Sequence, residues 1–354
     1  MKDPYRYLST HDPIDPEKLA LCEFVFSNCS FEHCKYTIII PEYRRPVTVR
    51  ESIRSAVSQD YSGDYEVLIT SDGQFPEEAE TEKVVREIAE THHNITYYRN
   101  RTNVGMFNNW NNSIYHSRGD WIVVLPDDDV LSPYFLSTID QFITQNHYSG
   151  MIGSHPHKIY GKEEFKADSF TKPSGVIKAR WIDHYGVFFD EGISVTGMTF
   201  DKKSILDFGG FHNVFFPVAD SVCMINYALK NNLVRLFCDI SAYRIDENVS
   251  QNSGVLQKIL LYAVHMKETV AESSTVLKRF YRTFRAEIIR DYINGAESTW
   301  ETHVEESEVD NDVKPGFSSS PIKYKLMKAN RKTIRLIHNV KLAIKCRGKT
   351  KIRM

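Results

Sequence analysis

The chain has 354 residues, of which 42% are hydrophobic and 25% are charged, so it holds enough apolar material for a buried core in one large domain or two. Its formal net charge of -2 hides an asymmetry: residues 321–354 carry 12 Lys and Arg with no Asp or Glu, and residues 1–320 carry the other 32 against all 46 Asp and Glu. No apolar stretch is long enough to span a bilayer, and no signal-peptide core follows Met1. These features argue against a disordered or membrane-spanning chain and predict a globular cytoplasmic protein with a distinct tail.

After an N-terminal extension of residues 1–35, strands and helices alternate. Short, β-branched runs typical of strands covered on both faces lie at residues 36–40, 66–70, 95–98 and 121–125. Helical spacing of apolar residues follows each run, at residues 46–59, 78–92, 104–117 and 134–145. This alternation predicts an α/β fold with a mainly parallel central sheet flanked by helices, in which ligands bind beyond the carboxyl ends of the strands.

The pattern is less regular after residue 150. Strands are predicted at residues 151–154, 195–200 and 234–243, a hairpin or loop at 155–180, and a helix at 220–230. We expect residues 36–254 to form one domain with a nucleotide-binding half (36–130) and an acceptor-binding half (131–254), followed by a helical extension (255–300), an acidic linker (301–320) and a basic amphipathic tail (321–354).

Three consecutive carboxylates, Asp127 to Asp129, follow the fourth predicted strand directly. Carboxylates this close repel one another and stay ionised together only where water or a cation compensates them. A divalent metal that holds a phosphate is one candidate for this cation. The alternative is a solvated turn, because Ser132-Pro133 can start the next helix without any ligand.

Other motifs follow in a characteristic order: Pro41-Glu-Tyr-Arg-Arg-Pro46, Ser71-Asp72-Gly73, Asn103-Val-Gly105 and a Gly209-Gly-Phe segment that leads to Asp220. With the acid triple among them, residues 36–252 resemble the family 2 glycosyltransferases, which have the GT-A fold. The resemblance implies that a sugar moves from a nucleotide diphosphate to an acceptor hydroxyl with inversion, with Mn²⁺ or Mg²⁺ as cofactor.

The resemblance also implies nucleotide-binding roles for Pro41, Tyr43, Arg45, Asp72, Asn103, Gly105, Asn111, Asp127 and Arg244. Tyr43 can stack on a base, and Arg45 can reach a phosphate. Asp72 would accept the ring N–H of uracil, which favours a UDP-sugar. Two alternatives remain open: Asn103 can cap the following helix, and Arg244 can form a surface ion pair with neighbouring acids.

The family's metal-binding motif places the metal on Asp128, with Asp129 assisting, and the ribose on Asp127. Asp220 falls on the position of the catalytic base, although an acid in the first turn of a helix is also favoured by the helix dipole. The segment Val195 to Met198 is expected to line the acceptor site.

The tail places Leu326, Ile334, Ile337, Val340 and Ile344 at near-helical spacing among Lys and Arg. This pattern predicts a helix on an anionic membrane surface, and docking of the helix on the acidic body is the alternative. Nucleic-acid binding is not expected, because aromatic residues are not interleaved with the basic ones.

We therefore expect a transferase that uses a saccharide or lipid-linked glycan as acceptor in surface polysaccharide synthesis, and that can lie peripherally on the inner face of a membrane. A sugar nucleotidyltransferase is one alternative, but the loop 41–46 lacks the glycine of a phosphate loop. A non-catalytic protein that binds glycan or tethers a complex at the membrane is the other.

Overall fold

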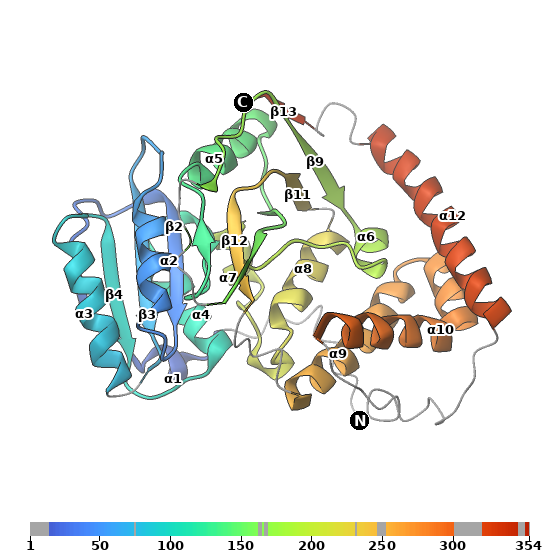
Figure 1. Ribbon diagram of the computed structural model, residues 1–354, viewed down its shortest axis with the longest axis horizontal. Coiled ribbons are helices and arrows are strands. Elements are labelled where there is room, and N and C mark those ends of the chain that lie inside the picture. Colours follow the sequence, from blue (N-terminus) through green and yellow to red (C-terminus); the bar gives the residue numbers. More distant parts are fainter. Residues whose placement is uncertain are drawn as a thin grey trace.

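A computed structural model describes residues 14–73, 76–161, 165, 169–230, 232–245, 253–300, 321–345 and 351–353. The first 13 residues of the N-terminal extension, the end of the predicted domain at 246–252 and the acidic linker 301–320 lie outside the described residues. Figure 1 shows a central sheet with helices on both faces and the C-terminal helices gathered at one side. The predicted α/β architecture with a C-terminal helical region is confirmed.

The central sheet has ten strands in the order β1-β4-β3-β2-β5-β10-β7-β11-β9-β13. Their bounds are β1 Cys22–Ser27, β2 Cys34–Glu42, β3 Tyr65–Ser71, β4 Ile95–Asn100, β5 Gly119–Val124, β7 Met151–Gly153, β9 Val176–Ile182, β10 Met198–Asp201, β11 Leu233–Phe237 and β13 Lys351–Arg353. Strands β4, β3, β2 and β5 run parallel, and antiparallel pairs lie mainly in the second half of the sheet. A smaller sheet has the order β6-β12-β8, with β6 Val130–Leu131, β8 His157–Tyr160 and β12 Ser241–Ile245.

Alternate side chains of β2 enter cores on opposite faces of the sheet. Ile38 and Ile40 pack with helices α2 (Thr48–Val57), α3 (Glu77–Ala89) and α5 (Phe135–Asn146), and Ile39 packs with α4 (Met106–His116) and α8 (Ala219–Leu229). The β-branched run is wholly apolar because both of its faces are covered. The other helices are α1 (Pro16–Leu19), α6 (His184–Phe188), α7 (Lys202–Asp207), the 3₁₀ helix η3 (Asn213–Phe215), α9 (Ser253–Glu272), α10 (Thr275–Trp300) and α12 (Pro321–Lys345).

Three predicted segments differ from the structure. The hairpin or loop expected at 155–180 contains β8 and most of β9, which lie in different sheets. The N-terminal extension supplies β1, which pairs antiparallel with β4 and so belongs to the sheet. The single strand predicted at 234–243 is two strands, β11 and β12, that lie in different sheets. Apolar residues recur from Leu233 to Ile245 with only isolated polar residues among them, so periodicity alone does not reveal the break between the two strands.

The basic tail forms α12 at the edge of the molecule, where its N-terminal half packs against α10 (Figure 1). The structure therefore shows the docked alternative for this helix. Ile334, predicted on the same apolar face as Val340 and Ile344, instead points inward and packs on the core, whereas those two residues are exposed. Within the described ranges, no helix is long and apolar enough to cross a membrane.

Candidate active site

A buried glutamate organises the loops at the carboxyl edge of the parallel strands. Glu42 ends β2 and is paired in register with Ser71 at the end of β3. Its two carboxylate oxygens accept hydrogen bonds from the Ser71 hydroxyl (2.6 Å) and from the backbone N–H of Arg45 (2.8 Å). Burial raises the pKa of Glu42. Glu42, to which the sequence assigned no role, therefore fixes the loop after β2 against β3.

Asp127 and Asp128, called the acid pair below, follow β5 and contact this loop. Asp127 Oδ2 accepts a hydrogen bond from the backbone N–H of Tyr43 (2.9 Å). One guanidinium nitrogen of Arg45 lies 3.3 Å from Asp127 Oδ1 and contacts Asp128 Oδ2 directly. Burial raises the pKa of both carboxyl groups, repulsion from Asp128 raises that of Asp127 further, and Arg45 lowers both. Arg45 thus supplies positive charge to two carboxylates that burial would otherwise favour in their neutral forms.

Asp129 has a different environment from the acid pair. It is fully buried, and its two oxygens accept hydrogen bonds from the Thr196 hydroxyl (2.5 Å) and the backbone N–H of Arg244 (2.9 Å). Burial and the neighbouring Asp128 raise its pKa well above the usual value. Asp129 therefore ties β12 and the segment at Thr196 to the loop of residues 126–129, here called the acid loop. Its predicted role as a metal ligand stays a prediction.

Arg244 lies beneath the acid loop with 2% of its surface exposed. Its Nη2 pairs with Glu51 of α2 (2.5 Å), Nε donates to the carbonyl oxygen of Asp128 (3.1 Å), and Nη1 donates to that of Gly161 (2.7 Å). The alternative of a surface ion pair is wrong, because the guanidinium is buried and held by these partners. Contact between Arg244 and a diphosphate stays a prediction, and these bonds would have to rearrange for it.

Asp72, at the end of β3, holds the loop that leads into α4. Its carboxylate accepts hydrogen bonds from the backbone N–H groups of Val104 (2.8 Å) and Gly105 (3.0 Å) and from the side-chain amide of Asn100 (3.0 Å). Gly105 is the N-cap residue with φ of 86°, a conformation that favours glycine. Asn103 is exposed and is not the cap, so the capping alternative is wrong. Nucleotide contacts of these residues stay predictions.

Three further residues that were predicted to bind the nucleotide differ in how accessible they are to a ligand. Tyr43 is 47% exposed, so its ring is open to stacking. Pro41 is buried within β2 opposite Thr70. Asn111 forms two hydrogen bonds with the backbone of Phe211, at 2.8 Å to its N–H and 2.9 Å to its carbonyl oxygen. Asn111 therefore ties α4 to the Gly-Gly-Phe segment, and its contact with the nucleotide stays a prediction.

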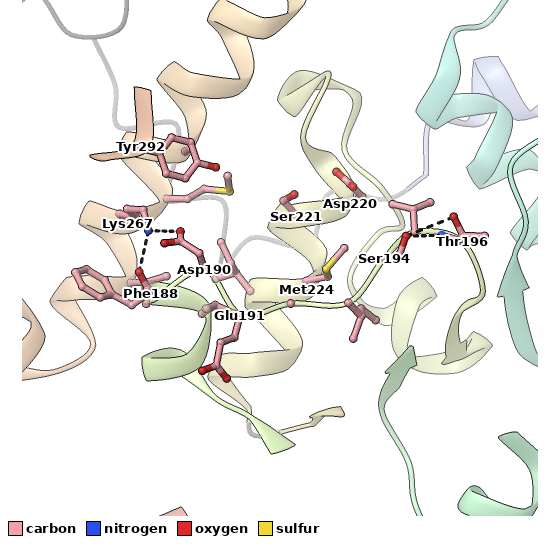
Figure 2. Close-up of a pocket in the computed structure, with 18 of the residues that line it drawn as sticks. Phe188, Asp190, Glu191, Ser194, Thr196, Asp220, Ser221, Met224, Lys267 and Tyr292 are labelled. Atoms are coloured by element: carbon pink, nitrogen blue, oxygen red, sulfur yellow. Dashed lines mark hydrogen bonds and ion pairs between the residues drawn. The ribbon is translucent and has the colours of Figure 1, made fainter. Parts of the chain in front are cut away.

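A cavity of about 460 Å³ lies beside the acid loop and includes the predicted catalytic base. Pro126 and Asp129 line it from the acid loop, and Asp220 and Ser221 line it from the first turn of α8. Figure 2 shows Asp220 and Ser221 close to the segment that carries Thr196. Burial raises the pKa of Asp220 to about 6, although hydrogen bonds with Ser221 oppose the shift. At neutral pH Asp220 is therefore ionised and able to accept a proton.

The other side of the cavity is formed by the C-terminal helices. Lys267 of α9 is buried, and its Nζ donates hydrogen bonds to the carbonyl oxygen of Phe188 (2.8 Å) and to Asp190 Oδ1 (2.5 Å), as drawn in Figure 2. Tyr292 of α10 also lines this part. Sequence reasoning missed these residues, because a lysine or tyrosine in a long helix carries no signal of its own. Of the segment expected at the acceptor site, Val195 and Thr196 line the cavity.

Residues 37–205 match the family model described as Glycosyl transferase family 2. This segment of the chain therefore has the sequence pattern of a family 2 glycosyltransferase domain. It is similar to a Campylobacter jejuni protein named GalNAc(5)-diNAcBac-PP-undecaprenol beta-1,3-glucosyltransferase, with 27% identity over 225 residues that cover 63% of this chain and 67% of that protein. An uncharacterized glycosyltransferase of Haemophilus influenzae is 29% identical over 185 residues, which cover 52% of this chain and 58% of that protein.

Solved structures show the fold of this glycosyltransferase. The S. aureus TarS fragment 1–349 in complex with UDP-GlcNAc is similar with a TM-score of 0.53 and 16% identity, over 84% of this chain and 88% of that one. The same fragment in complex with UDP gives a TM-score of 0.52. These structures confirm the predicted GT-A fold. The family match and the named glycosyltransferase relatives support an enzyme that transfers a sugar, and they favour neither a nucleotidyltransferase nor a non-catalytic protein.

The acid pair of the glycosyltransferase fits a divalent cation. Both of its carboxylates face the same positively charged nitrogen of Arg45. Carboxylate oxygens are ligands that Mg²⁺ and Mn²⁺ prefer, and few are needed where phosphate and water complete the coordination shell. Among the described residues, no group of three or more His, Cys, Asp or Glu is arranged to hold an ion. A cation at the acid pair would therefore depend on oxygens of the nucleotide diphosphate.

Proposed function

We propose that this glycosyltransferase transfers a sugar with inversion from a UDP-sugar to a hydroxyl group of a saccharide or lipid-linked glycan, with Mn²⁺ or Mg²⁺ at the acid pair. One observation carries the proposal. The cavity extends from the acid loop at Pro126 and Asp129 to the carboxylate of Asp220, so a donor held at the loop and an acceptor beside the base share one space.

Asp220 has the properties that the reaction requires of a base. The acceptor oxygen attacks the anomeric carbon from the face opposite the diphosphate, the bond from that carbon to the diphosphate oxygen breaks, and the hydroxyl proton passes to a carboxylate oxygen of Asp220. A pKa of about 6 leaves Asp220 ionised at neutral pH and more basic than an ordinary aspartate. The inverted configuration at the anomeric carbon follows from this geometry.

The donor is held by the loops at the edge of the sheet. The exposed ring of Tyr43 is available to stack on the base. We assign the ribose to Asp127 and the cation to Asp128, and a bound cation supplies positive charge to the departing diphosphate. Arg45 lies beside both carboxylates, and in this proposal its guanidinium turns from them to a phosphate. Asp72 accepts the uracil N–H in this proposal, which is why UDP-sugars are favoured.

The acceptor is proposed to be part of a lipid-linked glycan in surface polysaccharide synthesis. The C. jejuni relative is named for a glucosyl transfer to an undecaprenol-linked glycan, and the basic tail suits work at an anionic membrane surface. We accordingly expect the protein to lie on the inner face of the membrane. The relative's substrate motivates this assignment, which concerns chemical class and not a particular sugar or linkage.

The test is a screen for release of nucleotide from UDP-, GDP- and dTDP-sugars in Mn²⁺, Mg²⁺ or EDTA, together with calorimetry of UDP binding. UDP-GlcNAc is tested first, because a protein of this fold binds it. We expect UDP to bind in Mn²⁺ at least tenfold more tightly than in EDTA, since the cation joins the diphosphate to the carboxylate of Asp128. Equal affinity in the two conditions would remove the metal from the proposal.

Variants separate the two carboxylate roles. Asp128→Asn is expected to weaken UDP binding in Mn²⁺, whereas Asp220→Asn is expected to leave it unchanged and to abolish transfer. The matched control is Asp120→Asn, an exposed aspartate on β5 eight residues before Asp128, which should behave as the unaltered protein. Normal transfer by Asp220→Asn would move the base to another residue.

A further inference from the structure

The tail helix α12 has an apolar face that is largely exposed. Its large apolar side chains on this face, here called the outer stripe, are each between 52% and 71% exposed; they are Ile322, Leu326, Leu336, Ile337, Val340 and Ile344. At 100° per residue they fall within one sector of about 100°. Exposed Lys325 and Lys332 flank this sector on one side, and exposed Lys341 flanks it on the other. Apolar residues bordered by lysines are typical of a helix that lies in a membrane interface.

The opposite face of α12 is docked on the body by packing and by charge. Met327 is 1% exposed in the main core, and Ile334 packs against the same core. The basic residues of this inner face pair with acids: Arg331 with Asp291 (3.1 Å), Arg335 with Glu191 (2.7 Å), and His338 with Asp183 (2.9 Å). The positive charges of the tail are therefore divided between a docked set and the exposed lysines.

The docked set also contacts the wall of the cavity. Residues 187–196, here called the wall segment, line most of one side of the cavity. Asp190 accepts a bond from Arg331 on Oδ2 (3.1 Å) and from Lys267 on Oδ1 (2.5 Å), so a single carboxylate joins the tail to a residue of the cavity lining. At the other end of the wall segment, Thr196 donates to Asp129 of the acid loop. The wall segment is thus held by the tail at one end and by the acid loop at the other.

An anionic bilayer is the occupant that fits the outer stripe. Residues 1–320 have a net charge of -14 and would be repelled by such a surface, whereas the exposed lysines beside the stripe would be attracted to it. A second copy of the chain fits less well, because pairing two stripes would bring two sets of lysines together. A membrane that binds the outer stripe leaves the contacts of the inner face intact. Lipid binding by the inner face would instead break its ion pairs and expose Met327 and Ile334.

We infer that α12 lies on an anionic membrane through its outer stripe while its inner face stays docked, so that membrane seating stabilises the wall of the acceptor cavity. A surface that binds only the docked helix shifts the equilibrium towards docking, and the wall segment shares that stabilisation through Asp190 and Glu191. This inference rests on the proposed function, since the cavity matters as the acceptor site. It makes the tail a positioning element of that site as well as an anchor.

The first experiment measures binding of the full chain to phosphatidylcholine vesicles with and without phosphatidylglycerol. We expect binding only to the anionic vesicles and a loss of about tenfold or more in the double variant Leu336→Ser, Val340→Ser. The control is Val176→Ser, Val214→Ser, which alters two valines of similar exposure (54% and 64%) elsewhere. Unchanged binding by the Leu336, Val340 variant would overturn the assignment of the stripe. So would a protein that self-associates through the stripe and ignores vesicles.

The second experiment measures amide hydrogen exchange with anionic vesicles as the probe. We expect vesicles to slow exchange about fivefold or more in both α12 and the wall segment. The double variant Arg331→Met, Arg335→Met should still bind vesicles but lose the protection of the wall segment, because the bonds of the tail to Asp190 and Glu191 are gone. Faster exchange in the wall segment would mean that the membrane separates α12 from the body. Unchanged exchange would mean that membrane binding is not coupled to the wall segment. Either result overturns the inference. Calorimetry of UDP with Mn²⁺ on the same samples shows separately whether the proposed function stands.

Discussion

Replacement of Asp220 by Asn should stabilise the protein while it removes activity. Burial raises the pKa of Asp220 to about 6 from the ordinary value of 3.8, so the folded protein binds the proton more tightly than the unfolded chain does. Below pH 3.8 such a group does not change the free energy of unfolding. As the pH rises from 3.8 to about 6 it lowers that free energy progressively, and above about 6 the loss is constant. The uncharged amide does not carry that penalty.

The size of the effect follows from the shift. About two pKa units correspond to about 3 kcal/mol for a group wholly removed from water. Asp220 lines an open cavity and keeps part of its surface exposed, so solvent screening reduces the expected gain to about 1–2 kcal/mol. Urea unfolding of the unaltered protein and of Asp220→Asn at pH 4 and pH 8 measures this gain. We expect the curves to coincide at pH 4 and the variant to be the more stable at pH 8.

The control for this measurement is Asp64→Asn, an exposed aspartate in the turn between α2 and β3, which should show no such pH-dependent gain. In the transfer reaction, loss of the base should lower the rate by about 10²–10⁴-fold and leave UDP affinity unchanged. The unaltered enzyme should lose about tenfold in rate between pH 7 and pH 5 as Asp220 becomes protonated. An Asp220→Asn variant that is less stable at pH 8 would refute the assignment of a strained, desolvated base.

Three further predictions concern the loops around the donor. In calorimetry, Arg45→Gln should bind Mn²⁺ alone about tenfold more tightly but bind UDP with Mn²⁺ more weakly. If both affinities were weaker, Arg45 would not be exchanging the carboxylates for a phosphate when the ligands bind. Thr196→Val should cost about 1–3 kcal/mol in urea unfolding, because it leaves an oxygen of buried Asp129 without its donor, and an unchanged stability would contradict this. Asn111→Ala should cost about 1–3 kcal/mol through its lost bonds to Phe211 and spare UDP affinity; weaker UDP binding would instead place Asn111 at the nucleotide.

The sequence predicted the parts of this molecule that depend on local pattern. The β-branched run 36–40 forms the centre of β2, since both of its faces are covered by helices. Parallel neighbours place their carboxyl ends at one edge, which brings the acid triple close to the loop after β2. Asp220 in the first turn of α8 lines the same cavity as Asp129, as the order of motifs indicated.

The partners of buried polar groups could not be predicted in the same way, because they depend on contacts between distant segments. Arg244 has acidic neighbours in the sequence, which suggested a surface ion pair, but the position of β12 beside β6 turns it inward to Glu51, which precedes it by 193 residues. Lys267 occupies an ordinary helical position, and only the packing of α9 against the wall segment gives it Asp190. Residue type alone does not show which charges will share a buried site.

The charges at the donor site give a physical reason for cation and nucleotide to bind together. In the free protein, Arg45 pairs with both carboxylates of the acid pair and compensates their charge. A nucleotide alone would draw Arg45 towards its phosphates and leave two buried carboxylates repelling each other and the ligand. A divalent cation alone would meet a guanidinium already at those oxygens. When the cation and the nucleotide bind together, the cation neutralises the carboxylates and Arg45 turns to the diphosphate. Each ligand therefore removes the electrostatic repulsion or competition that would weaken binding of the other. The same exchange predicts that Arg45→Gln separates the two affinities, because it abolishes the competition for the carboxylates and the phosphate contact with one change.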